Sequence, residues 1–233
     1  MSWTNPLAIE QLWSKDISDF EAKKRVGEKV AEKVRDGDVI GVGSGSTAYV
    51  ALLSIQERIK SEGLTVKAIP TSHEMTLTCA QLGIPVTTLQ ANRPHWGFDG
   101  ADEVDDQRRL VKGRGGALFR EKLVMASSPL TYILVDPSKF VGKLGEKFPI
   151  PVEVHPEAIH LVQERLEAIR EVEGSMLRPA DGKDGPIVTE NGHLILDVSV
   201  HTVPAKFEAY LKGMTGVVES GLFEDYRIEI LSL

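Results

Sequence analysis

Apolar positions along the first two thirds of the chain alternate between a helical period and short continuous runs. The short runs predict strands at 38–43, 65–70, 85–89, 96–99 and 130–136. The helical period predicts helices at 48–63, 74–82 and 118–127, and a first helix that starts at a capping box in 18–21 and ends by Gly37. This alternation of strand and helix is typical of an α/β fold with a mostly parallel sheet covered on both faces.

The pattern changes after residues 147–154. A strand at 147–154 is followed by a helix that opens at Pro156, and Asn191-Gly192 separates two apolar runs, 187–190 and 193–198, as in a β-hairpin. A helix at 204–213 and a strand at 217–222 complete the pattern. This order predicts a smaller α+β domain of ferredoxin-like type at 149–223. The tail 226–231 is expected to return to the first sheet, so the larger domain comprises 1–148 plus 224–233.

Composition narrows the classes of function. The 233 residues include 27 basic and 34 acidic side chains, for a net charge of −7, so no global basic field favours nucleic acid or an anionic membrane as a partner. The single cysteine, Cys79, lies in a predicted helix and is expected to be a small buried hydrophobic residue. The chain shows no apolar run long enough for a membrane span and no secretion leader. We therefore expect a cytoplasmic protein.

The turn from the first strand to the second helix reads Gly41-Val-Gly-Ser-Gly-Ser-Thr-Ala48. Backbone amides and the helix dipole make such a turn a site for an anion, and its hydroxyl groups add donors. The spacing also matches a dinucleotide fingerprint, but that motif needs an acidic residue after the next strand, where Val66–Ser72 has none. We therefore favour a monophosphate cradle over a nicotinamide site, with a purely structural turn as the remaining alternative. No Walker lysine follows the glycines.

Two further motifs carry the residues of a proton-transfer site. Asp99-Gly-Ala-Asp-Glu103 and Lys112-Gly-Arg-Gly-Gly-Ala-Leu-Phe-Arg-Glu121 combine carboxylates, an ammonium group and glycine-rich turns. The acidic residues lack the spacing of a calcium loop, and the histidines form no HExxH pair. No serine stands at the centre of a nucleophile elbow. Metal-dependent and nucleophilic catalysis are therefore not indicated.

Taken in order along the chain, these motifs closely resemble those of the type A ribose-5-phosphate isomerases. The resemblance rests on the glycine turn, DGADE, KGxGGAL…REK, Val135–Lys139, Phe148–Glu153 and Asn191–Asp197, and it extends from about Lys23 to Phe223. It implies a Rossmann-like domain with a smaller lid or oligomerisation domain. It also implies interconversion of ribose 5-phosphate and ribulose 5-phosphate without a cofactor, in a homodimer or homotetramer.

The resemblance assigns site residues in this chain. The family's catalytic pattern falls on Asp99, Asp102, Lys112 and Glu121. Aldose–ketose isomerisation needs a base for the carbon-bound proton, for which we favour Glu121, and a cation for the developing oxyanion, for which we favour Lys112. Asp99 or Asp102 is expected to open the furanose ring and to assist transfer between O1 and O2. The expected substrate-binding residues are Lys23, Gly43, Ser44, Gly45, Ser46, Thr47, Gly113, Gly115, Gly116 and Lys139.

Some positions depart from the family pattern. Arg114 interrupts the glycine run after the lysine, Phe119 stands where threonine is common, and Ser44 replaces a threonine in the phosphate turn.

Residues 1–18, with Trp3 and Trp13, are expected to form a subunit contact. Two other functions stay open at this point: a sugar-phosphate-sensing effector domain, and an isomerase or lactonase of another phosphorylated sugar. The sensing role is disfavoured because residues 1–37 show no helix-turn-helix or basic face.

Overall fold

The structure, a computed structural model, describes residues 17–182 and 184–232. Its contacts divide the chain into two compact units. Among the described residues, the first unit comprises 17–100, 120–138 and 227–232, and the second comprises 101–119, 139–182 and 184–226. The subunit contact expected of residues 1–18 falls, except for its last two residues, outside the described part of the chain.

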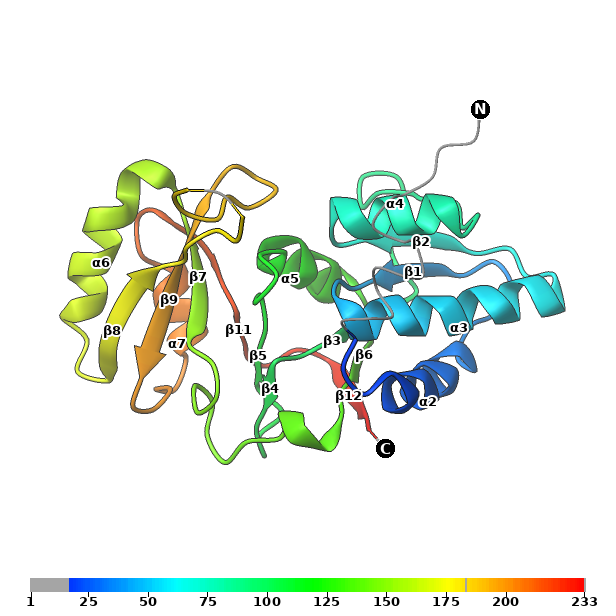
Figure 1. Cartoon of the computed structure of the whole chain (residues 1–233), viewed down its shortest axis with the longest axis horizontal. Coiled ribbons are helices and arrows are strands. Elements are labelled where there is room, and N and C mark those ends of the chain that lie inside the picture. The colour runs from blue at the N-terminus through cyan, green and yellow to red at the C-terminus, as the bar shows by residue number, and fades with distance from the viewer. Residues whose placement is uncertain (1–16, 183, 233) are drawn as a thin grey trace. The chain divides into compact units, whose positions relative to one another are not determined.

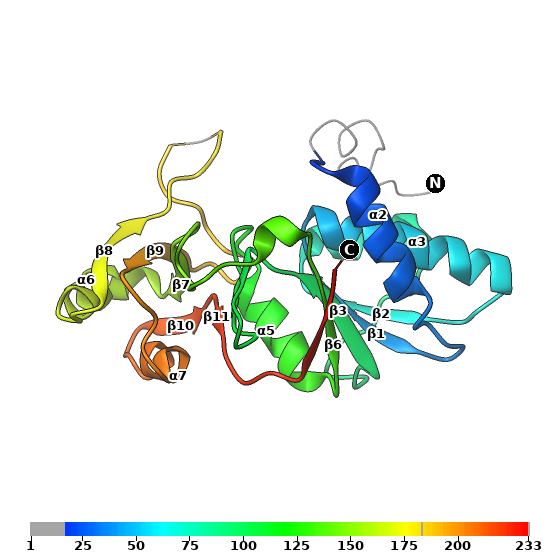
Figure 2. The ribbon, with the colours of Figure 1, turned by 90° about the horizontal axis from the view of Figure 1, so that it is seen from below.

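A five-stranded parallel sheet forms the centre of the first unit (Figures 1 and 2). Its order is β12-β6-β3-β1-β2, and every neighbouring pair is parallel. The strands are β1 (Val39–Val42), β2 (Lys67–Pro70), β3 (Trp96–Gly100), β6 (Thr131–Leu134) and β12 (Ile228–Leu231). The last strand pairs with β6, which confirms that the tail returns to this sheet.

Helices cover both faces of this sheet. They are α2 (Phe20–Ala31), α3 (Ser46–Glu62), α4 (His73–Gln81) and α5 (Leu118–Ser127), the last belonging to the first unit from Arg120 onward. Buried residues of α2 and α3 pack with Ile40 and Phe98 of the sheet in one apolar core. On the opposite face, Val124 of α5 lies against β1 at Gly41. The predicted α/β architecture is therefore confirmed.

The second unit is built around a four-stranded antiparallel sheet with the order β10-β7-β9-β8. Along the chain its elements are β7 (Ile150–Val154), α6 (Ile159–Glu167), β8 (Val172–Leu177), β9 (Leu194–Val200), α7 (Phe207–Lys212) and β10 (Val217–Ser220). This βαββαβ order is the ferredoxin-like arrangement expected from the sequence. Both helices share one apolar core with the sheet, through residues such as Val162, Leu211 and Val152.

A smaller antiparallel sheet in the second unit has the order β11-β5-β4. Its strands are β4 (Glu103–Val104), β5 (Leu110–Val111) and β11 (Leu222–Phe223). Each strand has only two residues, too short to give an apolar pattern of its own in the sequence. Pairing with β11 groups residues 101–119 with the second unit, whereas the sequence placed them in the larger domain. Residues 139–148 differ in the same way from the expected boundaries.

Three local predictions were wrong. Residues 85–89 form no strand, and a single parallel bridge joins Ala68 to Val86. The first helix has no capping box, because its N-cap is Asp19 in a left-handed conformation that makes no side-chain cap bond. The Asn191-Gly192 turn exists, with the Gly192 amide donating to Thr189 O and the Thr189 amide donating to His193 O, but residues 187–190 form no strand and β9 pairs with β7 and β8. Pro186, which cannot donate a ladder hydrogen bond, precedes that run.

Candidate active site

The glycine turn between β1 and α3 leaves the first amides of a seventeen-residue helix without a side-chain cap. Gly45 is the N-cap, and the next residues, Ser46 and Thr47, open the helix. Uncapped amides at such a terminus are suited to an anion. The buried Lys23 of α2 donates from Nζ to Ser46 Oγ at 3.1 Å, so a cation lies at the same terminus. Ser44 Oγ lies 2.7 Å from Thr71 Oγ1.

Gly43 connects this turn to the acidic motif. Its amide donates to Phe98 O on the neighbouring strand β3 at 2.8 Å. A Cβ at position 43 would lie 2.2 Å from both Cγ and Oδ1 of Asp99, so only glycine allows the strand to pass the carboxyl group so closely. Asp99 is buried near the carboxyl end of β3, and its Oδ1 accepts the Gly100 amide at 2.8 Å. The close packing fixes where this carboxylate lies.

Glu121 lies in the first turn of α5 and is buried. It lines a small cavity together with Asp99, Thr71 and Thr131, among others. The first unit therefore brings two of the predicted catalytic carboxylates to one cavity. Such a pair can divide the roles of acid and base, provided that their surroundings keep them in different protonation states.

Lys112 is buried in the second unit, directly after β5. Its amide donates to Gly221 O at 2.8 Å, and its ammonium group lies 5.8 Å from the centre of the Phe223 ring. Both partners come from the chain around β11, so this short strand positions the backbone of the lysine. Lys112 thus follows directly on a paired strand, and its own amide is hydrogen-bonded to the neighbouring chain.

The glycine run after Lys112 lies beside Asp102. Gly113 has φ +94°, and a Cβ there would lie 2.7 Å from Leu118 Cβ. The Arg114 amide donates to Asp102 Oδ2 at 3.3 Å, and the Asp102 amide donates to Val111 O at 2.8 Å. A Cβ at Gly115 would meet nothing, so packing does not explain that glycine. Gly116 has φ +85°.

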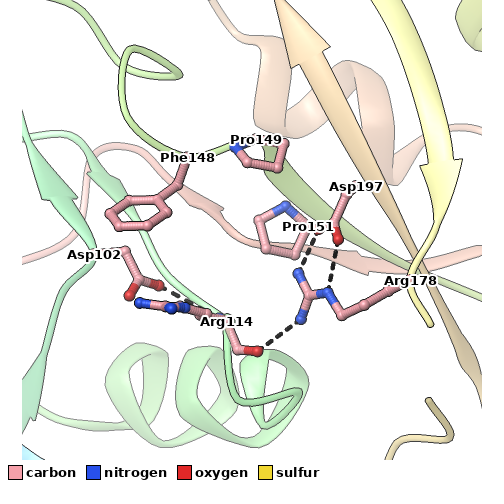
Figure 3. Close-up of a pocket in the computed structure, with 7 residues that line it drawn as sticks. All are labelled: Asp102, Arg114, Phe148, Pro149, Pro151, Arg178 and Asp197. Carbon is pink, nitrogen blue, oxygen red and sulfur yellow. Dashed lines mark hydrogen bonds and ion pairs between the residues drawn. The ribbon is translucent and has the colours of Figure 1, made fainter. Parts of the chain in front are cut away.

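A pocket of about 300 Å³ lies next to this loop, and Figure 3 shows the residues that line it. The residues that line it, all from the second unit, are Asp102, Arg114, Phe148, Pro149, Pro151, Arg178 and Asp197. The Arg114 guanidinium lies 5.1 Å from the centre of the Phe148 ring, close enough for a cation–π interaction. Lys139 Nζ is 5.8 Å from the same ring centre. Arg114, which interrupts the glycine run, thus has a defined packing partner.

Glu103, the last residue of the acidic motif, holds a neighbouring loop in place. It is fully buried, and its carboxylate accepts the amides of Gly145, Lys147 and Phe148 at 2.7, 2.5 and 2.9 Å. These bonds hold the segment that carries Phe148 into the pocket. Sequence reasoning missed this role, and it also missed Phe148, Arg178 and Asp197 as pocket residues, because their partners are distant in the chain.

Among residues 17–182 and 184–232, no group of three or more His, Cys, Asp or Glu side chains is arranged to bind a metal ion. Cys79 is buried as predicted, and burial raises the pKa of its thiol to about 12. No helix in the same ranges is long and apolar enough to cross a membrane.

Comparisons with known proteins identify the family. A parallel sheet with an uncapped glycine turn and buried carboxylates is typical of α/β proteins that act on phosphorylated ligands. The model of the ribose 5-phosphate isomerase A (phosphoriboisomerase A) family matches residues 67–232. The ribose-5-phosphate isomerase A of Methanocaldococcus jannaschii is 42% identical over 210 residues, which cover 89% of this chain and 92% of that protein. The enzyme of the same name from a Synechococcus species is 42% identical over 207 residues, covering 86% and 88%.

Solved structures agree with this assignment. The structure of ribose 5-phosphate isomerase A from Methanocaldococcus jannaschii has a TM-score of 0.87 and 39% identity, covering 92% of this chain and 96% of that one. A D-ribose-5-phosphate isomerase in complex with phospho-erythronic acid also has a TM-score of 0.87, at 32% identity, with coverage of 93% and 96%. The chain therefore belongs to the ribose 5-phosphate isomerase A family.

Proposed function

We propose that the protein interconverts D-ribose 5-phosphate and D-ribulose 5-phosphate by proton transfer through an enediolate, without a cofactor. Membership of the family supports the reaction. The observation that carries the mechanism is the cavity lined by both Asp99 and Glu121. Two buried carboxylates beside an anion-binding helix terminus suit proton transfer within a phosphorylated sugar.

Glu121 is the proposed base. It removes the proton from C2 of the open-chain aldose and returns it to C1, so that one carboxylate serves both half-reactions. Burial limits the access of bulk water to this carboxylate, which protects the intermediate from side reactions. General base catalysis of this kind contributes about 10²- to 10⁴-fold to a rate.

Lys112 is the proposed electrostatic stabiliser. Proton removal from carbon places negative charge on the neighbouring oxygen, and a fixed ammonium group in a buried setting stabilises that charge strongly. The paired backbone of Lys112 favours this role, because a preorganised cation needs little rearrangement during the reaction.

Asp99 and Asp102 are proposed to handle the protons on oxygen. Ring opening moves a proton from the anomeric hydroxyl to the ring oxygen O4, and isomerisation then moves a proton between O1 and O2. The two carboxylates are three residues apart, so the chain keeps their Cα atoms within about 11 Å. Two acids so close in the chain suit two successive proton transfers.

The phosphate group is proposed to bind the 43–47 turn with the help of Lys23, and Lys139 is proposed as a further cation for it. The uncapped amides of α3 and the Lys23–Ser46 hydrogen bond support the first assignment. Gly113, Gly115 and Gly116 are proposed to let the backbone approach the sugar, and the open space at Gly115 is consistent with this.

We further propose a homodimer or homotetramer in the cytoplasm, with residues 149–223 acting as a lid or in oligomerisation. The single buried thiol of Cys79 suits a reducing compartment. Light scattering coupled to gel filtration measures the oligomeric state directly.

The assay that tests the function follows ribulose 5-phosphate formation from ribose 5-phosphate by proton NMR. Glucosamine 6-phosphate and allose 6-phosphate are the competing substrates, and each reaction is run with and without EDTA. We expect turnover of ribose 5-phosphate alone, unaffected by EDTA. Preferred turnover of another sugar phosphate would identify a different isomerase. Binding of sugar phosphates without turnover would favour a sensing domain, and loss of activity in EDTA would contradict the metal-free mechanism.

A further inference from the structure

The peptide group between Gly113 and Arg114 makes a hydrogen bond at each end. Its carbonyl, Gly113 O, accepts from Arg178 Nη1 at 3.1 Å. Its amide, Arg114 N–H, donates to Asp102 Oδ2 at 3.3 Å. A trans peptide is planar, and its C=O and N–H point in opposite directions, so the bond at one end sets the direction of the other. Figure 3 shows Arg114 with Asp102 and Arg178 on its two sides.

Arg178 is itself held by the main sheet of the second unit. Its Nε donates to Asp197 Oδ2 at 2.8 Å, and its Nη2 pairs with Asp197 Oδ1. Asp197 lies in the middle of β9, which is paired on both sides by β7 and β8. Arg178 Nη1 also donates to Arg114 O at 2.8 Å. The rigid, planar guanidinium thus links a central strand to two successive carbonyls of the loop.

The loop needs such an external anchor. Gly113 has φ +94° and no room for a Cβ, so the position must be glycine, and glycine alone does little to fix the orientation of the following peptide. A rotated peptide would direct the Gly113 carbonyl towards the Asp102 carboxylate, where two negative groups repel each other. The positive charge of Arg178 favours the orientation in which the carbonyl faces away from Asp102.

We propose that Arg178, held by Asp197, is a positioning residue that fixes the 113–114 peptide so that its amide orients the Asp102 carboxylate. This inference rests on the proposed function, in which Asp102 transfers protons on the substrate. Arg178 acts through the loop backbone and through Asp102. Its loss therefore lowers turnover more than it weakens substrate binding.

The first test compares Arg178→Ala with the wild-type protein and with Arg170→Ala, which removes the same charge from an exposed position. A misplacement of about 1 Å in a reacting group can cost about 10²-fold in rate, so we expect kcat of Arg178→Ala to fall about 10- to 100-fold with KM changed less than about threefold. Millimolar guanidinium ion is expected to restore part of kcat in Arg178→Ala only. Unchanged kcat, or an effect confined to KM, would overturn the proposal.

A second variant separates positioning from folding. Arg178→Ala leaves Asp197 without its partner, which can destabilise the protein. The double variant Arg178→Met/Asp197→Leu replaces the ion pair with apolar side chains of similar size and still lacks the donors to Gly113 and Arg114. We expect it to fold, by circular dichroism and thermal unfolding, and to keep the low kcat. A folded double variant with wild-type kcat would overturn the proposal.

The third readout does not depend on activity. In the wild-type protein, the Arg114 amide is expected to exchange slowly with solvent deuterium, as measured by NMR, because it donates to Asp102. In the Arg178 variants its exchange is expected to be at least about tenfold faster, and equal exchange rates would count against the positioning role. This measurement remains valid if the wild-type protein fails to isomerise ribose 5-phosphate, so the two proposals can fail separately.

Discussion

Glu121 and Asp99 are candidate catalytic residues because both are buried and both line the same cavity. Each is a carboxylate with little access to solvent, and both line one cavity of the first unit. Glu103, in the same motif as Asp99, is also buried, but it accepts three backbone amides of residues 145–148 and so holds a loop in place. The acidic residues of one sequence motif therefore have different roles. Those roles become visible only from the groups that each side chain contacts in the fold.

The substitution Glu121→Gln tests the base directly. It keeps the shape of the side chain and removes its ability to accept a proton, so kcat is expected to fall about 10²- to 10⁴-fold while the fold is retained. Glu164→Gln, on an exposed face of α6, is the matched control. Steady-state assay of ribulose 5-phosphate formation measures both. Near-normal turnover in a folded Glu121→Gln protein would exclude Glu121 as the base.

Lys112→Ala tests the stabiliser. We expect turnover to be suppressed while binding of phospho-erythronic acid, measured by calorimetry, persists with reduced affinity, because the phosphate is held elsewhere. Lys67→Ala, at an exposed position of β2, provides a control for the loss of one positive charge. An unchanged kcat in Lys112→Ala would refute the assignment.

Residue roles were only partly accessible from the sequence. The motifs that contain Asp99, Asp102, Lys112 and Glu121 could be selected because their residue types and glycines stand close together in the chain. The partners of Arg114 could not be predicted, since Phe148 and Arg178 lie 34 and 64 residues further on. Contacts of this separation leave no local pattern.

At the scale of elements, the turn between β1 and α3 is constrained by its close approach to Asp99. Gly43→Ala is expected to force Asp99 away from its position, because the new methyl group would lie 2.2 Å from the carboxyl carbon. We expect a loss of about 1–3 kcal/mol in the free energy of unfolding, measured by urea denaturation, together with reduced kcat. Gly174→Ala in β8, where a Cβ meets nothing, is the control. Equal stability and activity in the two variants would contradict this account of the turn.

Long elements with a strong period were predicted well, and short ones were not. α3 ends at Glu62 with Gly63 as a left-handed C-cap, as its apolar stripe and terminal glycine indicated. β4, β5 and β11, with two residues each, exist because they pair with one another. The strand β8 was missed, since its half-exposed residues, including Glu173 and Met176, show no clear alternation.

At the scale of the whole molecule, the chain crosses between its two compact units inside both chemical motifs. It leaves the first unit after Gly100, within the acidic motif, and re-enters it at Arg120, within the lysine motif. The sequence predicted both fold types but placed these crossings elsewhere, because the pairing of β5 with β11 joins residues more than one hundred positions apart.

The proposed reaction moves a proton between two carbon atoms of ribose 5-phosphate. The most direct measurement is proton and deuterium NMR of the wild-type reaction in deuterium oxide. We expect ribulose 5-phosphate with solvent deuterium incorporated at C1, because the protonated base exchanges with solvent in a fraction of turnovers while the enediolate is bound. Absence of ribulose 5-phosphate, or product that stays free of deuterium at C1 through many turnovers, would contradict it.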